Sequence, residues 1–338
     1  MSDVNWLALA IALPVGFAGT WLARWTGHHF GWLDAPGPGR IHSKPIPRLG
    51  GPAILVAFVL GTIIAVPLDT PAIGLLVGAV AVVAITLVDD LRGLSPRDKF
   101  LGQLVAAAIP VAFGVRIDGI SNPLGGIIFL ALAVAIPFTF FWIIGMMNAM
   151  NFVDGVDGLA GGVAVVAAAV LVVLSVRLGQ YAIATMGLAI IGATLGFLPF
   201  NFHRASIIMG DSGAHLLGYL IAVLAIIGGA KIATALLVLG IPVLEVAWTI
   251  LRRLRAGGKF HARDTDHLHH RLLKAGLSPR KLVLAYYAVG AVFGVVALYF
   301  QRLEKLYALG ALALLMIATL YWLARSDRSP TGEDRSRG

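Results

Sequence analysis

The sequence predicts an all-α polytopic membrane protein with about eleven transmembrane helices. Of its 338 residues, 59% are hydrophobic and only 13% are charged, and the mean hydropathy is +0.88. The surface of a water-soluble domain of this size would not tolerate that composition. Runs such as 161–176 are apolar on every side, which indicates helices rather than the alternating strands of a membrane barrel.

Apolar runs of about 20 residues, long enough to cross a bilayer core of about 30 Å, recur between short polar breaks. Most of the 26 Lys and Arg residues fall in loops on one side, which predicts an outside N-terminus and a cytoplasmic C-terminus. We expect one integral membrane domain over 1–324 and a disordered tail over 325–338. The expected helices are 4–24, 51–67, 71–89, 99–115, 126–147, 159–177, 181–198, 213–229, 232–251, 282–300 and 306–324, and the cytoplasmic loops are 25–50, 90–98, 148–158, 199–212 and 252–281.

Composition also excludes some chemistry. The sequence contains no cysteine, so disulfides, thiolate metal sites and thiol nucleophiles are impossible. The formal charge of +9 is explained by Lys and Arg flanking apolar helices. We therefore expect no nucleic-acid partner.

Two adjacent carboxylates, Asp89 and Asp90, end the third expected helix at the cytoplasmic surface. Acids near hydrocarbon are costly, so they are functional candidates by default. The alternative is that they only end the helix in interfacial water, with Arg92 as their ion-pair partner. Lys99 and Gln103, four residues apart, share one helix face, which would direct Lys99 towards these acids.

Two further segments place acids beside glycines. In the first, Gly155 and Gly158 permit tight turns and close backbone approach, and the amides can donate to and accept from a base or a sugar. In the second, Asp211 precedes the eighth expected helix, where the alternative reading is a helix N-cap alone. The polar residues of the first segment are Asn148, Asn151, Asp154 and Asp157.

Carboxylates thus gather on one membrane face without any cysteine, which favours a hard cation with oxygen ligands. Mg²⁺ takes only one or two protein carboxylates, with substrate phosphates and water completing its shell. Nothing resembles the closed oxygen cage typical of Ca²⁺. We therefore expect a magnesium site in which most of the acids have other roles.

Two basic loops face these acids. The segment 40–51 is stiffened by prolines and ends in two glycines that allow close packing or ligand approach, although a purely topogenic loop would also be basic. The last cytoplasmic loop interleaves histidines with arginines, which suits a diphosphate and leaves a Zn²⁺ or Ni²⁺ site as the alternative. Its residues include His261, Arg263, His267, His269, His270 and Arg271.

An acid and metal cluster facing a basic patch at the membrane surface predicts phosphoryl transfer between a soluble nucleotide and a lipid. An ion-coupled transporter is the alternative from another class, because membrane acids are its hallmark too. Transport sites usually lie near the bilayer midplane between inverted repeats, and the acids here cluster at one surface.

Taken in order, the motifs resemble those of the polyprenyl-phosphate N-acetylhexosamine-1-phosphate transferases of glycosyltransferase family 4. The resemblance spans nearly the whole membrane domain. Each motif alone is modest, and the ordered set is specific. The motifs are Pro45 to Gly51, Val88-Asp89-Asp90 through Lys99 and Gln103, Asn148 through Gly158, Gly210-Asp211-Ser212-Gly213, and His267 through Leu272.

The resemblance implies roles for individual residues. Asp211 would ligate Mg²⁺, for which Mn²⁺ can substitute, and Asn151 is a second candidate ligand. Asp89, as the candidate base, would be catalytic together with Asp90 and Lys99. The substrate-binding residues would be Lys44, Asn148, Asn151, Asp154, Asp157, His267, His269, His270 and Arg271.

The resemblance further implies a bacterial inner-membrane enzyme with a cytoplasmic active site. It would transfer N-acetylglucosamine 1-phosphate from a UDP-sugar to undecaprenyl or decaprenyl phosphate and release UMP, as the first membrane step of envelope glycan synthesis. The His-x-His-His-Arg-Leu loop resembles the branch that primes O-antigen, teichoic acid or arabinogalactan synthesis. The peptidoglycan branch, which transfers phospho-MurNAc-pentapeptide, is the alternative, and a homodimer is left open.

Overall fold

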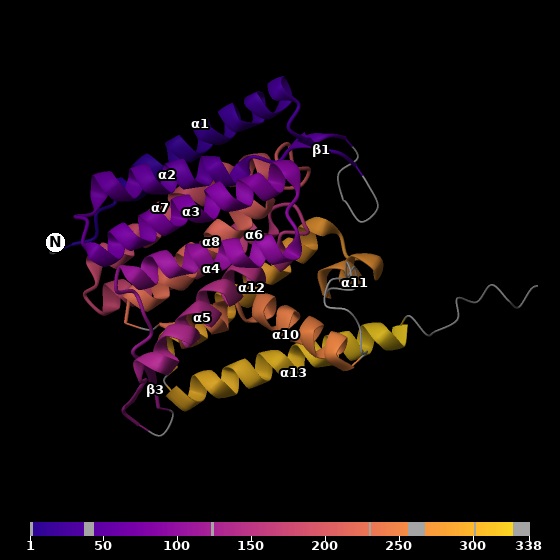
Figure 1. Ribbon diagram of the computed structural model, residues 1–338. Helices are drawn as coiled ribbons and strands as arrows, with labels where there is room; N and C mark the ends of the chain where they lie inside the picture. The colour runs from indigo at the N-terminus through magenta and orange to yellow at the C-terminus, as the bar shows by residue number, and fades with distance from the viewer. Residues whose placement is uncertain are drawn as a thin grey trace, which may run out of the picture.

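The computed structural model describes residues 3–36, 44–122, 125–229, 231–255, 268–300 and 302–326. This part of the chain is helical apart from two small antiparallel hairpins, β1 (Leu33–Asp34) with β2 (Ile46–Pro47) and β3 (Gly119–Ser121) with β4 (Ile127–Phe129). Most of the long helices run roughly along one direction (Figure 1). The helices are α1 (Leu7–Phe30), α2 (Gly50–Ala65), α3 (Thr70–Arg92), α4 (Pro96–Ala112), α5 (Leu132–Val153), α6 (Leu159–Arg177), α7 (Tyr181–Asn201), α8 (Gly210–Ile227), α9 (Ile232–Val238), α10 (Gly240–Arg255), α11 (Leu268–Lys274), α12 (Pro279–Tyr299) and α13 (Arg302–Ser326).

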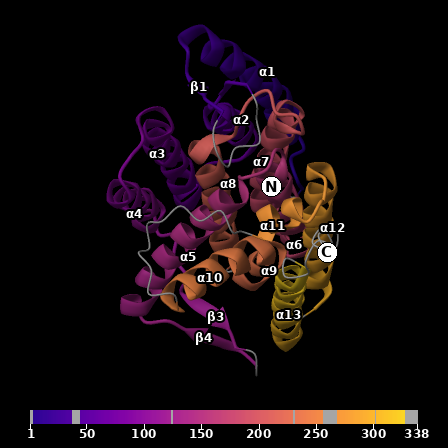
Figure 2. The same ribbon diagram turned by 90° about the vertical axis from the view of Figure 1, so that its right-hand side faces the viewer.

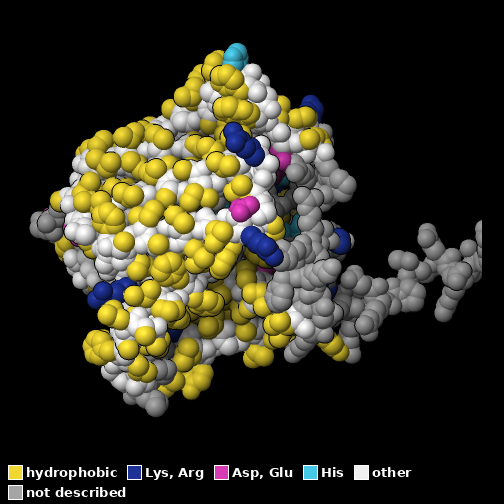
Figure 3. Space-filling model, viewed as in Figure 1, with side chains coloured by type: hydrophobic (Ala, Val, Ile, Leu, Met, Phe, Trp, Pro, Cys, Tyr) yellow, Lys and Arg dark blue, Asp and Glu magenta, His cyan; other side chains and the backbone are white. Residues whose placement is uncertain are grey.

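The protein is a multi-pass membrane protein, as predicted. Within the described ranges, eight helices are long and apolar enough to cross a bilayer, and nine if α9 and α10 count as one broken span. The face seen in Figure 3 is covered mostly by hydrophobic side chains, and an acidic and basic group lies towards the end that carries β1 and α11. The expected count of eleven spans and the orientation of the termini remain predictions.

Helix α8 lies at the centre of the bundle, between α2, α3, α5 and α6 (Figure 2). Of its 18 residues, 94% are buried, the highest share among the candidate spans in the described residues. Small residues bring the neighbours close, since a Cβ at Gly218 would lie 2.4 Å from the Met146 carbonyl oxygen. The start of α8, which carries Asp211, is therefore fixed in the middle of the bundle.

The segment before α2 is hydrogen-bonded to the segment before α8. The Ile208 N–H donates to the Pro47 carbonyl at 2.8 Å, and the Gly50 N–H donates to the Ile208 carbonyl at 3.1 Å. A Cβ at Gly51 would lie only 2.5 Å from the Gly213 nitrogen. The two glycines of the first basic loop therefore allow two helix starts to pack closely.

One expected helix is wrong. The sequence predicts a continuous helix over 232–251, but the structure ends α9 at Val238 and turns by 83° into α10. Pro242 explains the break, because a proline in a helix interior lacks a hydrogen-bond donor and its ring clashes with the carbonyl four residues earlier, which here belongs to Val238. The break displaces α10 from the direction of α9.

Several helix boundaries also differ from the expected ones. Helix α5 begins at Leu132 rather than 126, because β4 occupies the earlier residues, and it continues to Val153. Asn148 and Asn151 are therefore helical rather than in a loop. Helix α1 extends to Phe30, and α11 lies in the expected loop 252–281. Ending a helix at its first polar residue fails where that residue faces the bundle interior.

We predict that Gly51→Ala lowers the melting temperature of the detergent-purified protein. The added methyl would overlap the Ser212 hydroxyl and the Gly213 backbone, and such overpacking costs about 1–3 kcal/mol. Gly310→Ala on α13 is the control, because no atom lies within 4 Å of its added Cβ. Equal melting temperatures for the two variants would contradict the close packing of α2 on α8.

Candidate active site

The site is built on a cap at the start of α8. The Asp90 carboxylate, whose side chain is fully buried, accepts hydrogen bonds from the amides of Asp211 and Ser212, both at 2.9 Å. Such first-turn amides have no acceptor within their own helix. Gly210 precedes them with φ +75°, and a Cβ there would lie 2.7 Å from Asp90 Oδ2. The alternative that Asp211 itself caps this helix is wrong, since the capping carboxylate comes from α3.

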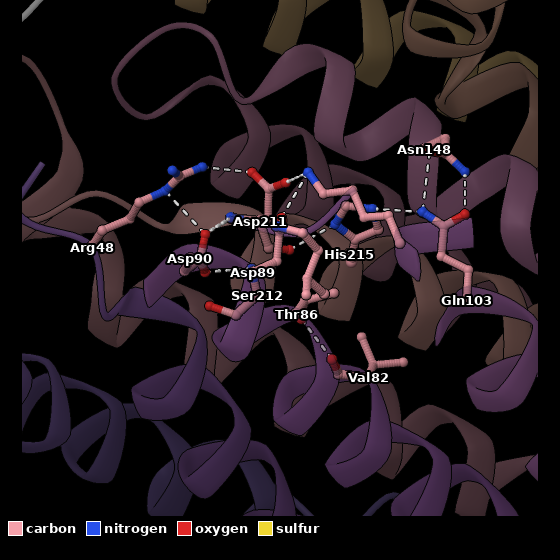
Figure 4. A network of polar contacts seen from close by, with 12 residues as sticks. Arg48, Val82, Thr86, Asp89, Asp90, Gln103, Asn148, Asp211, Ser212 and His215 are labelled. Atoms are coloured by element: carbon pink, nitrogen blue, oxygen red, sulfur yellow. Dashed lines mark hydrogen bonds and ion pairs between the residues drawn. The ribbon is translucent and has the colours of Figure 1, made fainter. Parts of the chain in front are cut away.

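Two cations join three carboxylates at this point (Figure 4). Arg48 lies 3.0 Å from Asp90 through Nε and 2.6 Å from Asp211 through Nη2. Lys99 Nζ lies 2.6 Å from the other Asp211 oxygen and 2.7 Å from Asp89 Oδ2. We call these five residues the carboxylate–cation network. The ion-pair partner of Asp89 is thus Lys99 and that of Asp90 is Arg48. Arg92, the partner expected if these acids only ended the helix, is not the partner of either.

The network is arranged with its cations outermost. The side chains of Arg48 and Lys99 are 32% and 33% exposed, whereas those of the three aspartates are between 0% and 13% exposed. Asp89 is also held by the chain that follows it, because its Oδ1 accepts the Leu94 N–H at 2.7 Å. Solvent therefore meets positive charge first, with the carboxylates behind it.

A chain of amides extends the network towards α5. His215, one turn after Asp211, points Nδ1 at the Asp211 carbonyl oxygen, 2.8 Å away, and Nε2 at the Gln103 amide nitrogen, 2.9 Å away. Gln103 and Asn148 exchange two hydrogen bonds through their side-chain amides. The shared helix face of Lys99 and Gln103 thus directs both side chains into the site, and Asn148 joins it from the end of α5.

The turn between α5 and α6 is fixed from the other side. Asn201 accepts the Gly158 N–H at 3.0 Å and donates to the Ile207 carbonyl at 3.0 Å. Asp157 accepts the Ala205 N–H at 3.0 Å, and His203 lies 3.9 Å from the same carboxylate. These contacts hold the turn that carries Asp154 and Asp157 next to the loop before α8.

The electrostatic field of the network reaches Asp154. Burial raises the pKa of the Asp154 carboxyl well above its usual range, the Arg48 charge opposes that shift, and the Asp211 and Asp90 charges reinforce it. Burial also works to lower the pKa of Arg48, but the neighbouring carboxylates of Asp90 and Asp211 outweigh it and leave that pKa raised. Asp154 therefore lies within the field of the site, and Arg48 stays charged.

The remaining residues expected at the site lie on α11, on α5 and beside β2. His269 is buried on α11 with its ring 4.4 Å from that of His270, and Arg271 follows on the same helix. Lys44 is exposed beside β2, and Asn151 is half-buried on α5. His267, like His261 and Arg263, lies outside the described residues.

The donor set matches a hard cation. Asp89, Asp90 and Asp211 supply three negative charges against two positive charges from Arg48 and Lys99, so the network retains a net negative charge. In the described part of the chain, no three His, Asp or Glu side chains are grouped so as to hold a metal ion by themselves. Mg²⁺ needs only one or two protein carboxylates when substrate phosphates supply the rest, so the residues present fit it.

Sequence reasoning missed three contributors. In the sequence, Arg48 stands out only as part of a basic segment. Asn201 falls in an expected loop and His215 in an expected helix, and neither has a predicted role. The signal for His215 was its spacing of four residues from Asp211, which puts both on one helix face. Nothing local marks Arg48 or Asn201, because their partners lie far away in sequence.

Comparison with known proteins identifies the class of this helical membrane protein. A family model described as glycosyl transferase family 4 matches residues 72–229. That range runs from α3 to just after α8 and contains Asp89, Asp90, Lys99 and Asp211. Together with the relatives described next, it places the chain in glycosyl transferase family 4.

Curated relatives cover most of the chain. The probable undecaprenyl-phosphate N-acetylglucosaminyl 1-phosphate transferase of Bacillus subtilis is 35% identical over 79% of this chain and 77% of its own length. The decaprenyl-phosphate N-acetylglucosaminephosphotransferase of Mycobacterium tuberculosis H37Rv is 35% identical over 96% and 90%. The phospho-N-acetylmuramoyl-pentapeptide-transferase of Geobacillus kaustophilus is 34% identical over 75% and 83%.

The raised pKa of Asp154 predicts that this residue makes the folded protein less stable at neutral than at acidic pH. When a carboxyl has a higher pKa in the folded than in the unfolded protein, the folded protein loses stability as the pH rises from the ordinary pKa, 3.8, through the raised pKa. Asp154→Asn removes that loss, so its melting temperature should exceed that of the native protein by a margin that grows from acidic to neutral pH. Asp118→Asn, at a carboxylate that is 58% exposed, is the control. A constant or negative margin for Asp154→Asn would contradict a raised pKa of the Asp154 carboxyl.

Proposed function

We propose that the protein transfers N-acetylglucosamine 1-phosphate from UDP-N-acetylglucosamine to a polyprenyl phosphate. The products are a polyprenyl-diphosphate sugar and UMP. Membership of glycosyl transferase family 4 and the names of the Bacillus and Mycobacterium relatives support the reaction. Family membership also argues against the ion-coupled transporter.

The observation that carries the proposal is the outward position of the two cations. Arg48 and Lys99 are each about one-third exposed and stand in front of nearly buried carboxylates. A diphosphate approaching from the polar side would therefore meet two fixed positive groups, and Arg48 can bind two phosphate oxygens at once through its planar fork. The carboxylates fix the cations before the substrate arrives, so little reorganisation remains at the reaction.

We assign the metal to Asp211, with Asn151 as the second candidate ligand. A bound Mg²⁺ would supply positive charge to the diphosphate oxygens. Asp211 suits this role because 13% of its side chain is accessible, more than for Asp89 or Asp90. A metal ion held by Asp211 would replace part of the pairing of that carboxylate with Arg48 and Lys99, whose donors could then bind phosphate oxygens.

The bond changes follow from the substrates. A lipid phosphate oxygen attacks the phosphorus next to the sugar, the bond from that phosphorus to the bridging oxygen breaks, and UMP leaves with the bonding electrons. The attacking phosphate is already ionised, so it needs positioning more than deprotonation. Asp89 has both oxygens engaged by Lys99 and the Leu94 amide, which favours a role in holding Lys99 in place.

An apolar groove lies beside the network and suits a lipid chain. A cavity of about 590 Å³ lies among α4, α5, α9 and α10, and its lining is almost entirely apolar. Phe100 lines it, next in sequence to Lys99, and Asn148 lines it while bonded to Gln103. The groove therefore begins beside the network and continues between helices that face the bilayer. We propose that it holds the part of the polyprenyl chain nearest the phosphate.

We place this site at the cytoplasmic face of a bacterial inner membrane. The β1–β2 hairpin and α11 lie at one end of the bundle (Figure 1), and the Pro47 carbonyl of that hairpin accepts the Ile208 N–H just before Asp211. The basic loops favour the inner side. The soluble nucleotide donor and the membrane-held acceptor would then meet where α3, α5 and α8 reach the surface.

The reaction is tested by measuring UMP release from the detergent-purified protein. We expect release with UDP-N-acetylglucosamine only when both Mg²⁺ and undecaprenyl phosphate are present, and we expect Asp211→Ala to abolish it. Release only with UDP-MurNAc-pentapeptide would keep the reaction and reassign the donor. A folded protein that releases no UMP with any UDP-sugar would overturn the proposal.

Filling the groove should weaken lipid binding alone. We predict that Ala247→Trp, which adds bulk to the groove lining, raises the KM for undecaprenyl phosphate at least about tenfold and leaves the KM for the nucleotide-sugar unchanged. Val295→Trp, at a position on α12 that is 54% exposed, is the control for added bulk. A rise in the donor KM, or no change in either, would place the acceptor elsewhere.

A further inference from the structure

Glu245 is a buried acid that the proposed reaction does not use. It lies on α10 with 3% of its surface exposed, separate from the carboxylate–cation network. The Tyr286 hydroxyl of α12 donates to Glu245 Oε1 at 2.7 Å, and Nδ1 of His269 on α11 lies 3.3 Å from Oε2. One carboxylate therefore connects three helices that meet near the end of the bundle.

His269 carries this connection to the turn between α5 and α6. With Nδ1 directed at Glu245, the opposite ring nitrogen points at Gly155, where a Cβ would lie 2.9 Å from Nε2. Gly155 is exposed and stands between the expected donor-site residues Asp154 and Asp157. The absence of a side chain at Gly155 thus lets the imidazole pack against the turn.

The carboxylate fixes the imidazole by chemistry as well as by shape. An acceptor facing Nδ1 favours the tautomer with its proton on that nitrogen, which leaves Nε2 directed at the turn. His269 is only 1% exposed, so the burial of both groups restricts the ring to this orientation. The substitution Glu245→Leu would fill similar space without providing that acceptor.

We infer that Glu245 is a positioning residue of the reaction. Through His269 it holds α11 against the Gly155 turn, and so fixes the half-buried His270 and Arg271 beside the part of the site that receives the nucleotide-sugar. This inference rests on the proposed function, because it assigns the donor to that turn. Glu245 itself does not contact substrate.

The test compares three variants at two buried positions that lie one turn apart on α10. Glu245→Leu removes the acceptor, Glu245→Gln keeps one carbonyl oxygen for His269, and Thr249→Val changes the buried position one turn later. Each is characterised by the KM values for donor and lipid, by kcat, and by hydrogen exchange of the α11 amides in detergent.

We expect Glu245→Leu to raise the donor KM at least about tenfold, with kcat and the lipid KM within about threefold of the native values. Exchange of the α11 amides should quicken in that variant alone. Glu245→Gln should recover most of the donor affinity, and Thr249→Val should match the native protein.

Two results would overturn the inference. One is native α11 exchange in Glu245→Leu, which would mean that the carboxylate does not hold this helix. The other is faster exchange with an unchanged donor KM, or with equal losses in every kinetic constant, which would make the contact structural only. Failure of the proposed function has a different signature, because the native protein itself would then release no UMP, while the exchange comparison needs no turnover.

Discussion

The hydrogen bonds from the Asp211 and Ser212 amides to the Asp90 carboxylate join α3 to the buried start of α8. They satisfy a helix end inside the bundle, where an unpaired amide would be costly. They also place a negative charge that recruits Arg48, which then reaches Asp211. One capping contact thus fixes the angle between two membrane helices and the position of the residue assigned to the metal.

The same arrangement explains how the site stays charged beside a membrane. No carboxylate of the network is without a cation or an amide, and no cation is without a carboxylate. Such fully paired groups tolerate burial that isolated charges would not. Because the cations are the more exposed members, the network presents positive charge outward although its net charge is negative. The apolar groove beginning at Phe100 then adjoins a polar surface suited to phosphate.

The sequence predicted the membrane fold, because long apolar runs have few other solutions, and it identified the acids, because carboxylates at helix ends are unusual in such a chain. It could not identify partners. Asp90 accepts a hydrogen bond from Asp211, 121 residues later in the chain, and Arg48 pairs with Asp211 across 163 residues. The bend after Val238 was missed because the apolar run continues through it, although Pro242 was the available signal. Nothing local in the sequence marks a role for Glu245, because its partners Tyr286 and His269 come from other helices.

We propose that Arg48 and Lys99, with a metal ion at Asp211, direct cleavage between the two phosphates of a nucleotide-sugar, and not between sugar and phosphate. A donor labelled with ³²P on the phosphate next to the sugar tests it most directly, after separation of lipid and nucleotide products. We predict that the label appears in the lipid fraction together with the sugar. A label that stays with the released nucleotide, as UDP, would contradict the account.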